Sequence, residues 1–162
     1  MIVEGNSNRR RAARGGAEPS GQVGGVPDQD PFAAFGPVDI LSLVANDAEI
    51  TRLESGQVLF AEGDPADCMY VVKSGRLRIR SGSVVYEDIG PGGIVGEMGL
   101  VERRQPRSAT VYALSDAELI AIDDARFFSL VGATPRFAVT VMQVLSRRLR
   151  AMDRRYRPEP RA

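Results

Sequence analysis

The fold of this chain is decided by Val95-Gly96-Glu97-Met98-Gly99-Leu100 and, six residues later, by Arg107-Ser108-Ala109-Thr110-Val111. An apolar strand that ends at Val95 must give way to a turn, and the glycine at position 96 lets the backbone bend tightly and approach a ligand. Residues 98–101 can form a single helical turn, whose first N–H groups have no partner within the helix. Such a helix start attracts anions. The first stretch therefore predicts an anion site.

The second stretch supplies side chains that suit a phosphate. Arg107 opens a β-branched run, so its guanidinium is expected at the start of a strand, where its planar fork of donors suits a phosphodiester better than a lysine would. Ser108 adds a hydroxyl that can donate to a phosphate or to a base edge. Glu97 would repel a phosphate unless its oxygens accept ligand hydroxyls, and a ribose 2′-hydroxyl is the natural candidate. Together the two stretches predict a pocket for a ribose phosphate.

The same residues resemble the phosphate-binding cassette of cyclic nucleotide-binding domains. A second signature of that family occurs upstream in residues 58–75, VLFAEGDPADCMYVVKSG, which place a Gly-Asp turn and an apolar strand at the expected spacing. The resemblance extends from about Val38 to about Tyr156 and is strongest to the sensor half of bacterial catabolite-activator-type regulators. It therefore covers most of the chain.

The resemblance implies a mainly β fold with flanking helices: an eight-stranded, jelly-roll-like β-roll with a short N-terminal helix, a cassette helix and a C-terminal amphipathic helix. It implies cAMP or cGMP as the ligand. Gly96 and Met98 would donate backbone N–H groups to the phosphate, and Glu97 would accept the ribose hydroxyl. Arg107 and Ser108 would bind the phosphate. Further candidates for the site, of which the apolar ones could equally be core residues, are Gly99, Arg148, Ile79, Tyr86, Val95 and Met152.

The C-terminal helix also bears on ligand binding through this resemblance. Arg148 aligns with an arginine that pairs with the cassette glutamate, which implies an Arg148–Glu97 ion pair. Met152 and Asp153 stand where hydroxyl residues contact adenine in the catabolite-activator relative, and this departure puts the choice of base in doubt. Ser108 is compatible with either purine. We expect cAMP to be favoured over cGMP.

The pattern outside the cassette predicts the same fold class without the family. Short β-rich runs with glycine turns between them argue for an all-β roll, and they cover residues 50–53, 58–60, 69–72, 77–80, 84–89, 94–95, 108–114 and 118–122. A short helix is expected from residue 38 to about residue 46. The spacing of apolar residues then becomes that of a helix over residues 123–131 and again after Pro135.

The helix after Pro135 is long and amphipathic. Its opposite face is basic, with Arg147, Arg150, Arg154 and Arg155. Three interpretations stay open: packing on its own roll, a homodimer seam through residues 137–156, or a lid over the ligand. The apolar positions, three, four or seven apart, are Phe137, Val141, Val144, Leu145, Leu149, Met152 and Tyr156.

Composition limits the chemistry that the chain can perform. The sequence has no histidine and a single cysteine, Cys68, which removes the commonest metal ligand and general base and excludes an internal disulfide. We therefore expect neither an enzyme nor a cofactor. No apolar run approaches the ~20 residues of a membrane helix, and the N-terminus lacks a signal-peptide core, so a cytoplasmic protein without membrane contact is expected. One domain over residues 38–156 is expected between disordered segments at 1–37 and 157–162.

The expected function is that of a stand-alone receptor, whose C-terminal helix passes ligand binding to an unknown effector protein or to self-association. The chain ends soon after Tyr156, where a transcription factor of this family would begin its helix-turn-helix, so no sequence-specific DNA binding is expected. Two alternatives stay open. One is a protein-interaction module of the same fold that binds no nucleotide. The other is weak, salt-dependent nucleic-acid binding by the basic helix.

Overall fold

The computed structural model describes residues 39–46, 49–103 and 105–156 of the 162-residue chain. The segments expected to be disordered, 1–37 and 157–162, lie outside the described residues. The described part contains eight strands and four helices. They are α1 Ile40–Val44, β1 Ile50–Leu53, β2 Val58–Phe60, β3 Cys68–Ser74, β4 Leu77–Ser81, β5 Val84–Ile89, β6 Ile94–Val95, α2 Glu97–Val101, β7 Thr110–Ala113, β8 Ala117–Asp123, α3 Asp124–Ala133 and α4 Pro135–Tyr156.

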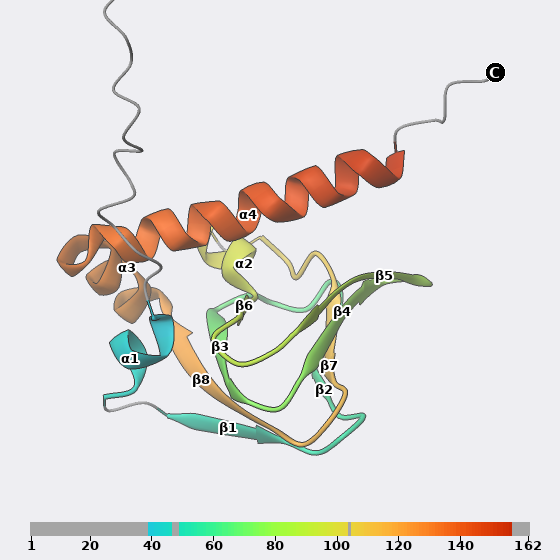
Figure 1. The fold of residues 1–162 in the computed structure, drawn as a ribbon, viewed down its shortest axis with the longest axis horizontal. Coiled ribbons are helices and arrows are strands. Elements are labelled where there is room, and N and C mark those ends of the chain that lie inside the picture. The colour runs from blue at the N-terminus through green and yellow to red at the C-terminus, as the bar shows by residue number, and fades with distance from the viewer. Residues whose placement is uncertain (1–38, 47–48, 104, 157–162) are drawn as a thin grey trace, which may run out of the picture. The chain divides into compact units, whose positions relative to one another are not determined.

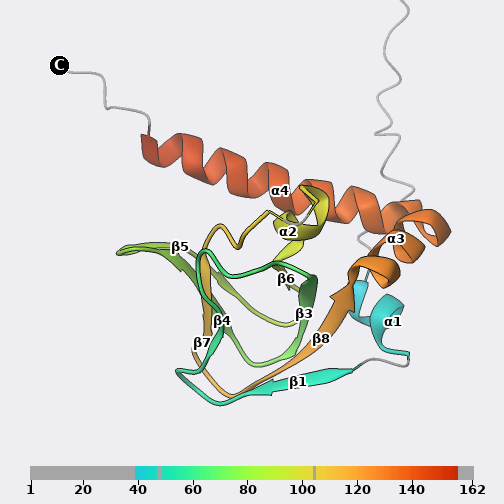
Figure 2. The same cartoon turned by 180° about the vertical axis from the view of Figure 1, so that it is seen from behind.

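The strands form two antiparallel sheets that face each other as a roll. One sheet has the order β1-β8-β3-β6 and the other the order β2-β7-β4-β5. Apart from the β4–β5 hairpin, the strands pair with neighbours far away in sequence, as in a jelly roll. Helices α2, α3 and α4 lie at one end of the roll, and Figures 1 and 2 show α4 running past α2 and across the open end of the sheets. The predicted eight-stranded roll with its flanking helices is confirmed.

The central strands β3 and β8 contribute side chains to two hydrophobic cores. Successive side chains of a strand point to opposite faces. On β8, Leu119 therefore joins the core inside the roll, while Ile120 and Ile122 join the core under the helices. On β3, Val71 and Val72 divide in the same way. This double burial explains why both strands are nearly continuous apolar runs.

The helices are anchored at their N-terminal ends. The Asp39 side chain accepts a hydrogen bond from the Leu41 N–H at the start of α1, and the Asp123 side chain accepts one from Arg126 at the start of α3. Side-chain oxygens at these positions satisfy N–H groups that have no partner within the helix. Helix α1 consequently begins at Ile40, two residues later than predicted, and α3 begins at Asp124.

Helix α4 packs on its own roll through the first half of its length. Phe137 is fully buried, and Val141 and Val144 join it in the core under the helices. On the opposite face of the helix, Met142 is 58% exposed and Leu149 is 61% exposed. The first of the three interpretations therefore holds for residues 137–144, and a separate apolar face remains uncovered. No single helix in the described ranges is long and apolar enough to cross a membrane; α3 and α4 meet that test only together, with a bend of 113° between them.

Candidate functional site

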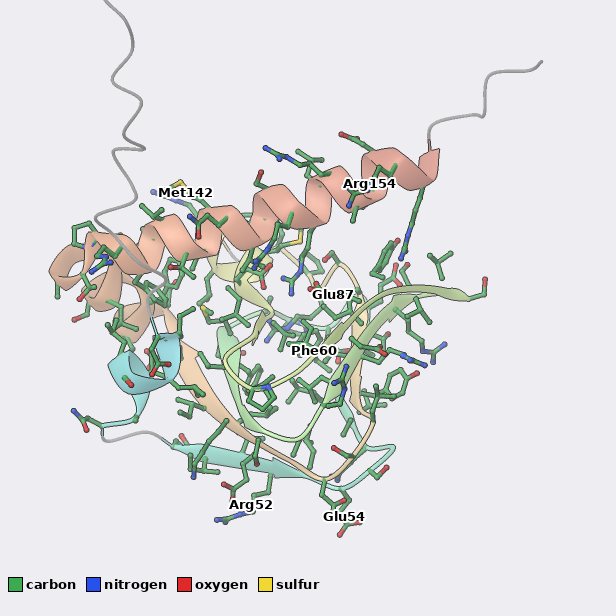
Figure 3. All side chains as sticks on the ribbon, in the orientation of Figure 1. Arg52, Glu54, Phe60, Glu87, Met142 and Arg154 are labelled. Atoms are coloured by element: carbon green, nitrogen blue, oxygen red, sulfur yellow. The ribbon has the colours of Figure 1, made fainter. Side chains whose placement is uncertain are left out.

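A cavity of about 390 Å³ lies between the roll and α4. Its floor is formed by apolar side chains of β2, β4 and β7, and its rim by the turn at Gly96, by α2 and by the second half of α4. In Figure 3, Phe60 and Glu87 are labelled in the roll below α4, which carries Arg154 near its end. The cavity brings together all the predicted site residues except Val95: Gly96, Glu97, Met98, Gly99, Arg107, Ser108, Arg148, Ile79, Tyr86 and Met152.

The turn at Gly96 requires a residue without a side chain. Gly96 has φ +78°, in the left-handed region, and a Cβ built on it would lie 2.6 Å from Arg107 Nη1. No side chain caps the start of α2, so its first N–H groups are available to a ligand. This turn thus places backbone donors beside the Arg107 guanidinium.

The Arg107 backbone is fixed by the turn that follows β2. Its N–H donates to the Asp64 carbonyl at 2.8 Å, and its carbonyl accepts from the Gly63 N–H at 2.8 Å. These bonds explain why β7 begins at Thr110 and not at residue 108 as predicted. They also tie the two sequence signatures to each other in space.

Arg107 is almost completely buried at 5% exposure, which is unusual for a cation. Its Nη1 donates to the carbonyls of Cys68, at 2.7 Å, and Gly96, at 3.2 Å. The guanidinium lies 4.1 Å above the ring of Phe60, within the range of a cation–π contact. Its nearest carboxylate is the exposed Asp67, 3.9 Å from Nη2. Nε is buried and has no hydrogen-bond partner in the described part of the chain.

Glu97 is the other buried charge of the site, with 1% exposure. Its Oε1 accepts a short hydrogen bond from Arg148 Nη1, which is the ion pair that the sequence resemblance implied. Its Oε2 is buried and accepts no hydrogen bond from any described residue. A buried polar atom without a partner costs about 1–3 kcal/mol. Among the described residues, the buried side-chain nitrogens and oxygens in this condition are Glu97 Oε2 and Arg107 Nε.

Arg148 joins α4 to helix α2 and to strands β5 and β6. Besides Glu97, it donates from Nη2 to the Ile94 carbonyl at 2.8 Å and from Nε to Glu87 at 2.9 Å. Burial disfavours its charge, but the attraction of Glu97 and Glu87 outweighs burial and raises the pKa of the Arg148 guanidinium above its ordinary value. The arginine is therefore a permanent cation that holds α4 over the cavity and beside the cassette.

The geometry joins a turn with uncapped backbone N–H groups, a buried guanidinium and a buried carboxylate in one cavity. A comparison with known families assigns the chain to a family. Residues 50–133 match the family model described as the cyclic nucleotide-binding domain. The chain belongs to the cyclic nucleotide-binding domain family. The matched segment runs from β1 to the end of α3 and contains the whole cassette.

Relatives of this cyclic nucleotide-binding domain occur within longer proteins. The chain is 35% identical over 103 residues to patatin-like phospholipase domain-containing protein 6 of Homo sapiens, which is 61% of this chain and 8% of that relative. It is 32% identical over 103 residues to the cyclic AMP receptor protein of Thermus thermophilus, which is 60% of this chain and 47% of that relative. The chain therefore spans less than half the length of either relative.

Solved structures of the family have the same fold. The catabolite activator protein of Thermus thermophilus superposes with a TM-score of 0.63 at 29% identity, covering 75% of this chain and 59% of that one. The EAL enzyme Bd1971 is similar in its cAMP-bound form, with a TM-score of 0.51, and in its cGMP-bound form, with a TM-score of 0.52, both at 31% identity. These superpositions cover 64% and 65% of this chain and 29% of the enzyme.

One of the predicted site residues has a different place in this cyclic nucleotide-binding domain from the one expected. Val95 does not line the cavity, because its strand direction points it into the core inside the roll, where it is fully buried. Gly99 does line it, but a Cβ there would lie 2.3 Å from the Cβ of Ala66. Helix α2 thus approaches Ala66 so closely that only a residue without a side chain fits at position 99. Ser108 stands at the rim and donates to the sulfur of Met98 at 3.5 Å.

Several cavity residues were not predicted from the sequence, and three of them make defined contacts. Phe60 lies beneath the Arg107 guanidinium, and Glu87 pairs with Arg148. Arg155 donates to the carbonyls of Val85, at 2.7 Å, and Tyr86, at 3.1 Å. The alternation of side-chain direction along β2 and β5 could have indicated which way Phe60 and Glu87 point. Their partners, however, depend on where α4 crosses the roll.

Proposed function

We propose that this chain is a receptor for a purine cyclic nucleotide, which it binds in the cavity under α4. The proposal rests on the two unpartnered buried atoms, Glu97 Oε2 and Arg107 Nε. A carboxylate oxygen accepts hydroxyl groups, and a guanidinium donates to phosphate oxygens. A ribose with a cyclic phosphate offers both partners on one rigid ring system. The Bd1971 forms with cAMP and with cGMP support this ligand class for a similar domain.

The cavity also has the size and wall expected of a small-molecule site. Its volume of about 390 Å³ falls within the ~300–1,000 Å³ typical of ligand pockets, which are mostly apolar with a few placed polar groups. Ile79 and Val111 supply apolar floor beside the cassette. The proposed role is binding and not catalysis, and a cytoplasmic location remains a prediction.

A calorimetric titration with cAMP and cGMP tests this proposal. Arg107→Ala should weaken binding of either nucleotide by about 10-fold or more, since a hydrogen bond to a charged group contributes about 1.5–3 kcal/mol. Arg107→Lys should restore little, because one ammonium cannot replace the planar fork. Arg150→Ala is the matched control, because Arg150 is an exposed arginine of α4 outside the cavity. Folded wild type that binds neither nucleotide would support the interaction-module alternative.

Transmission of the signal is proposed to run through α4. Arg148 couples Glu97, at the cassette, to α4, so a ligand that engages Glu97 must act on the helix position. Along the outer side of α4, the exposed Met142, Leu149 and Met152 and the half-buried Leu145 follow one another at spacings of three, four and three residues. This spacing is that of a coiled-coil seam. We therefore propose a second copy of the chain as the partner of this face.

Sedimentation of wild type and Leu149→Glu, with and without nucleotide, tests the pairing. Leu149 is 61% exposed, so the substitution should leave the fold intact. It should also shift a dimer to a monomer, since it places a charge in the seam. A monomeric wild type at all concentrations, with or without ligand, would instead point to an effector protein as the partner.

A further inference from the structure

The end of the cavity far from the cassette carries an arginine without a partner. Arg154 lines the cavity, and it forms no hydrogen bond or ion pair with any described residue. Its neighbour Arg155 is held by the carbonyls of β5, and Arg148 is held by two carboxylates. Arg154 is thus a cation at the cavity wall whose donors are not used within the described protein.

The position of Arg154 along α4 places it at the base end of a bound nucleotide. Arg148 contacts Glu97, which is expected to hold the ribose. Arg154 follows six residues later, which is about 9 Å further along the helix. On the roll side, this end of the cavity is lined by Tyr86 of β5. A purine attached to a ribose at the cassette can extend toward this end of the cavity.

The chemistry of an arginine discriminates between the two purines. A guanidinium has five N–H donors and no acceptor. Guanine presents two acceptors, O6 and N7, which arginine contacts in a bidentate manner, whereas adenine replaces O6 with an amino donor. When either edge that carries position 6 faces α4, the atom at that position accepts in guanine and donates in adenine. Arg154 can therefore bond guanine at this atom, and faces a donor when the base is adenine.

Other polar groups at this end of the cavity do not counter this preference. Glu87 is the carboxylate there, and one of its oxygens accepts from Arg148. The other oxygen can accept from the adenine amino group or from the guanine ring N–H, so it serves both bases. The discrimination thus falls to Arg154.

We propose that Arg154 is the residue that selects the base, and that it makes the pocket prefer cGMP to cAMP. This inference rests on the proposed function, since it concerns the same site. It replaces the preference for cAMP that was expected from the sequence. That expectation took account of Met152 and Asp153 but not of the next residue along the helix.

The test is the ratio of cGMP to cAMP affinity in the full chain, measured by calorimetry for wild type, Arg154→Ala and Arg154→Gln. Wild type should prefer cGMP by about 5-fold or more, because a bidentate base contact discriminates by about 1–3 kcal/mol. Arg154→Ala should remove the preference. Arg154→Gln should reverse it, because glutamine can contact the adenine amino group and N7 together. Arg150→Ala should leave the ratio unchanged.

Cyclic IMP tests whether the protein recognises guanine through O6 and N7 or through the 2-amino group. It retains O6 and N7 and lacks the amino group, so wild type should bind it about as tightly as cGMP. Equal affinity of wild type for cGMP and cAMP, or a preference that persists in Arg154→Ala, would overturn the role of Arg154 while leaving the receptor proposal intact. Absence of Arg107-dependent binding of any nucleotide would overturn both.

Discussion

Removal of Arg148 should destabilise the fold much more than removal of its partner Glu97. In Arg148→Met the Glu97 carboxylate stays buried at 1% exposure with no cation beside it. Loss of one partner from a buried pair costs about 3–5 kcal/mol, because the remaining charge is uncompensated. In Glu97→Gln, by contrast, Arg148 keeps Glu87 at 2.9 Å and the Ile94 carbonyl at 2.8 Å. The expected cost of that change is about 1–2 kcal/mol.

The double variant Glu97→Gln/Arg148→Met should be more stable than Arg148→Met alone, since it leaves no buried charge. Urea unfolding of the four proteins gives the coupling free energy from a double-mutant cycle. We expect a coupling of about 2 kcal/mol, within the range found for residues of one ion-pair network. Arg52→Met is the control, because Arg52 pairs with Glu118 on the surface with 76% of its side chain exposed, and such pairs contribute about 0–1 kcal/mol. Additive effects, or equal costs for the two single variants, would refute the assignment of a buried pair.

Three further changes have defined outcomes. Gly96→Ala should lower the unfolding free energy by at least about 1–2 kcal/mol in urea titrations, because φ is +78° and the new Cβ would meet Arg107; wild-type stability would contradict the strained turn. Phe137→Ala should cost about 3–5 kcal/mol in the same assay, since Phe137 of α4 is fully buried in the core between the helices and the roll; a loss below about 1 kcal/mol would mean that α4 is loosely packed. Arg78 lowers the pKa of Asp88 below its ordinary value of 3.8, so the stabilisation is complete above that value and is lost as the pH falls through the lowered pKa. Asp88→Asn should accordingly be less stable than wild type at neutral pH and converge with it in acid; a pH-independent gap would exclude the charge pair.

The sequence was most informative where local rules decide the structure. The alternation of β-branched residues and the glycine turns located all eight strands, because register and turns act over a few residues. The cassette residues Glu97 and Arg107 could be named because their chemistry and spacing belong to one short segment. Their convergence in one cavity then followed from the strand order.

Prediction was poorer where a contact joins distant elements. Val95 was expected in the ligand wall, but the alternation of β6 turns it toward the core inside the roll. The partners of Arg148 and Arg155 on β5 depend on the angle at which α4 crosses the sheets. A helical period shows which residues share a face, but not what that face meets.

The central claim is that Glu97 accepts the ribose hydroxyl of a cyclic nucleotide. The most direct measurement is calorimetric binding of cGMP and its 2′-deoxy analogue to wild type and to Glu97→Gln. We predict saturable binding of cGMP by wild type, an affinity for the deoxy analogue lower by about 10-fold or more, and a much smaller difference in Glu97→Gln. An undiminished difference in Glu97→Gln, or no saturable binding by folded wild type, would contradict the claim.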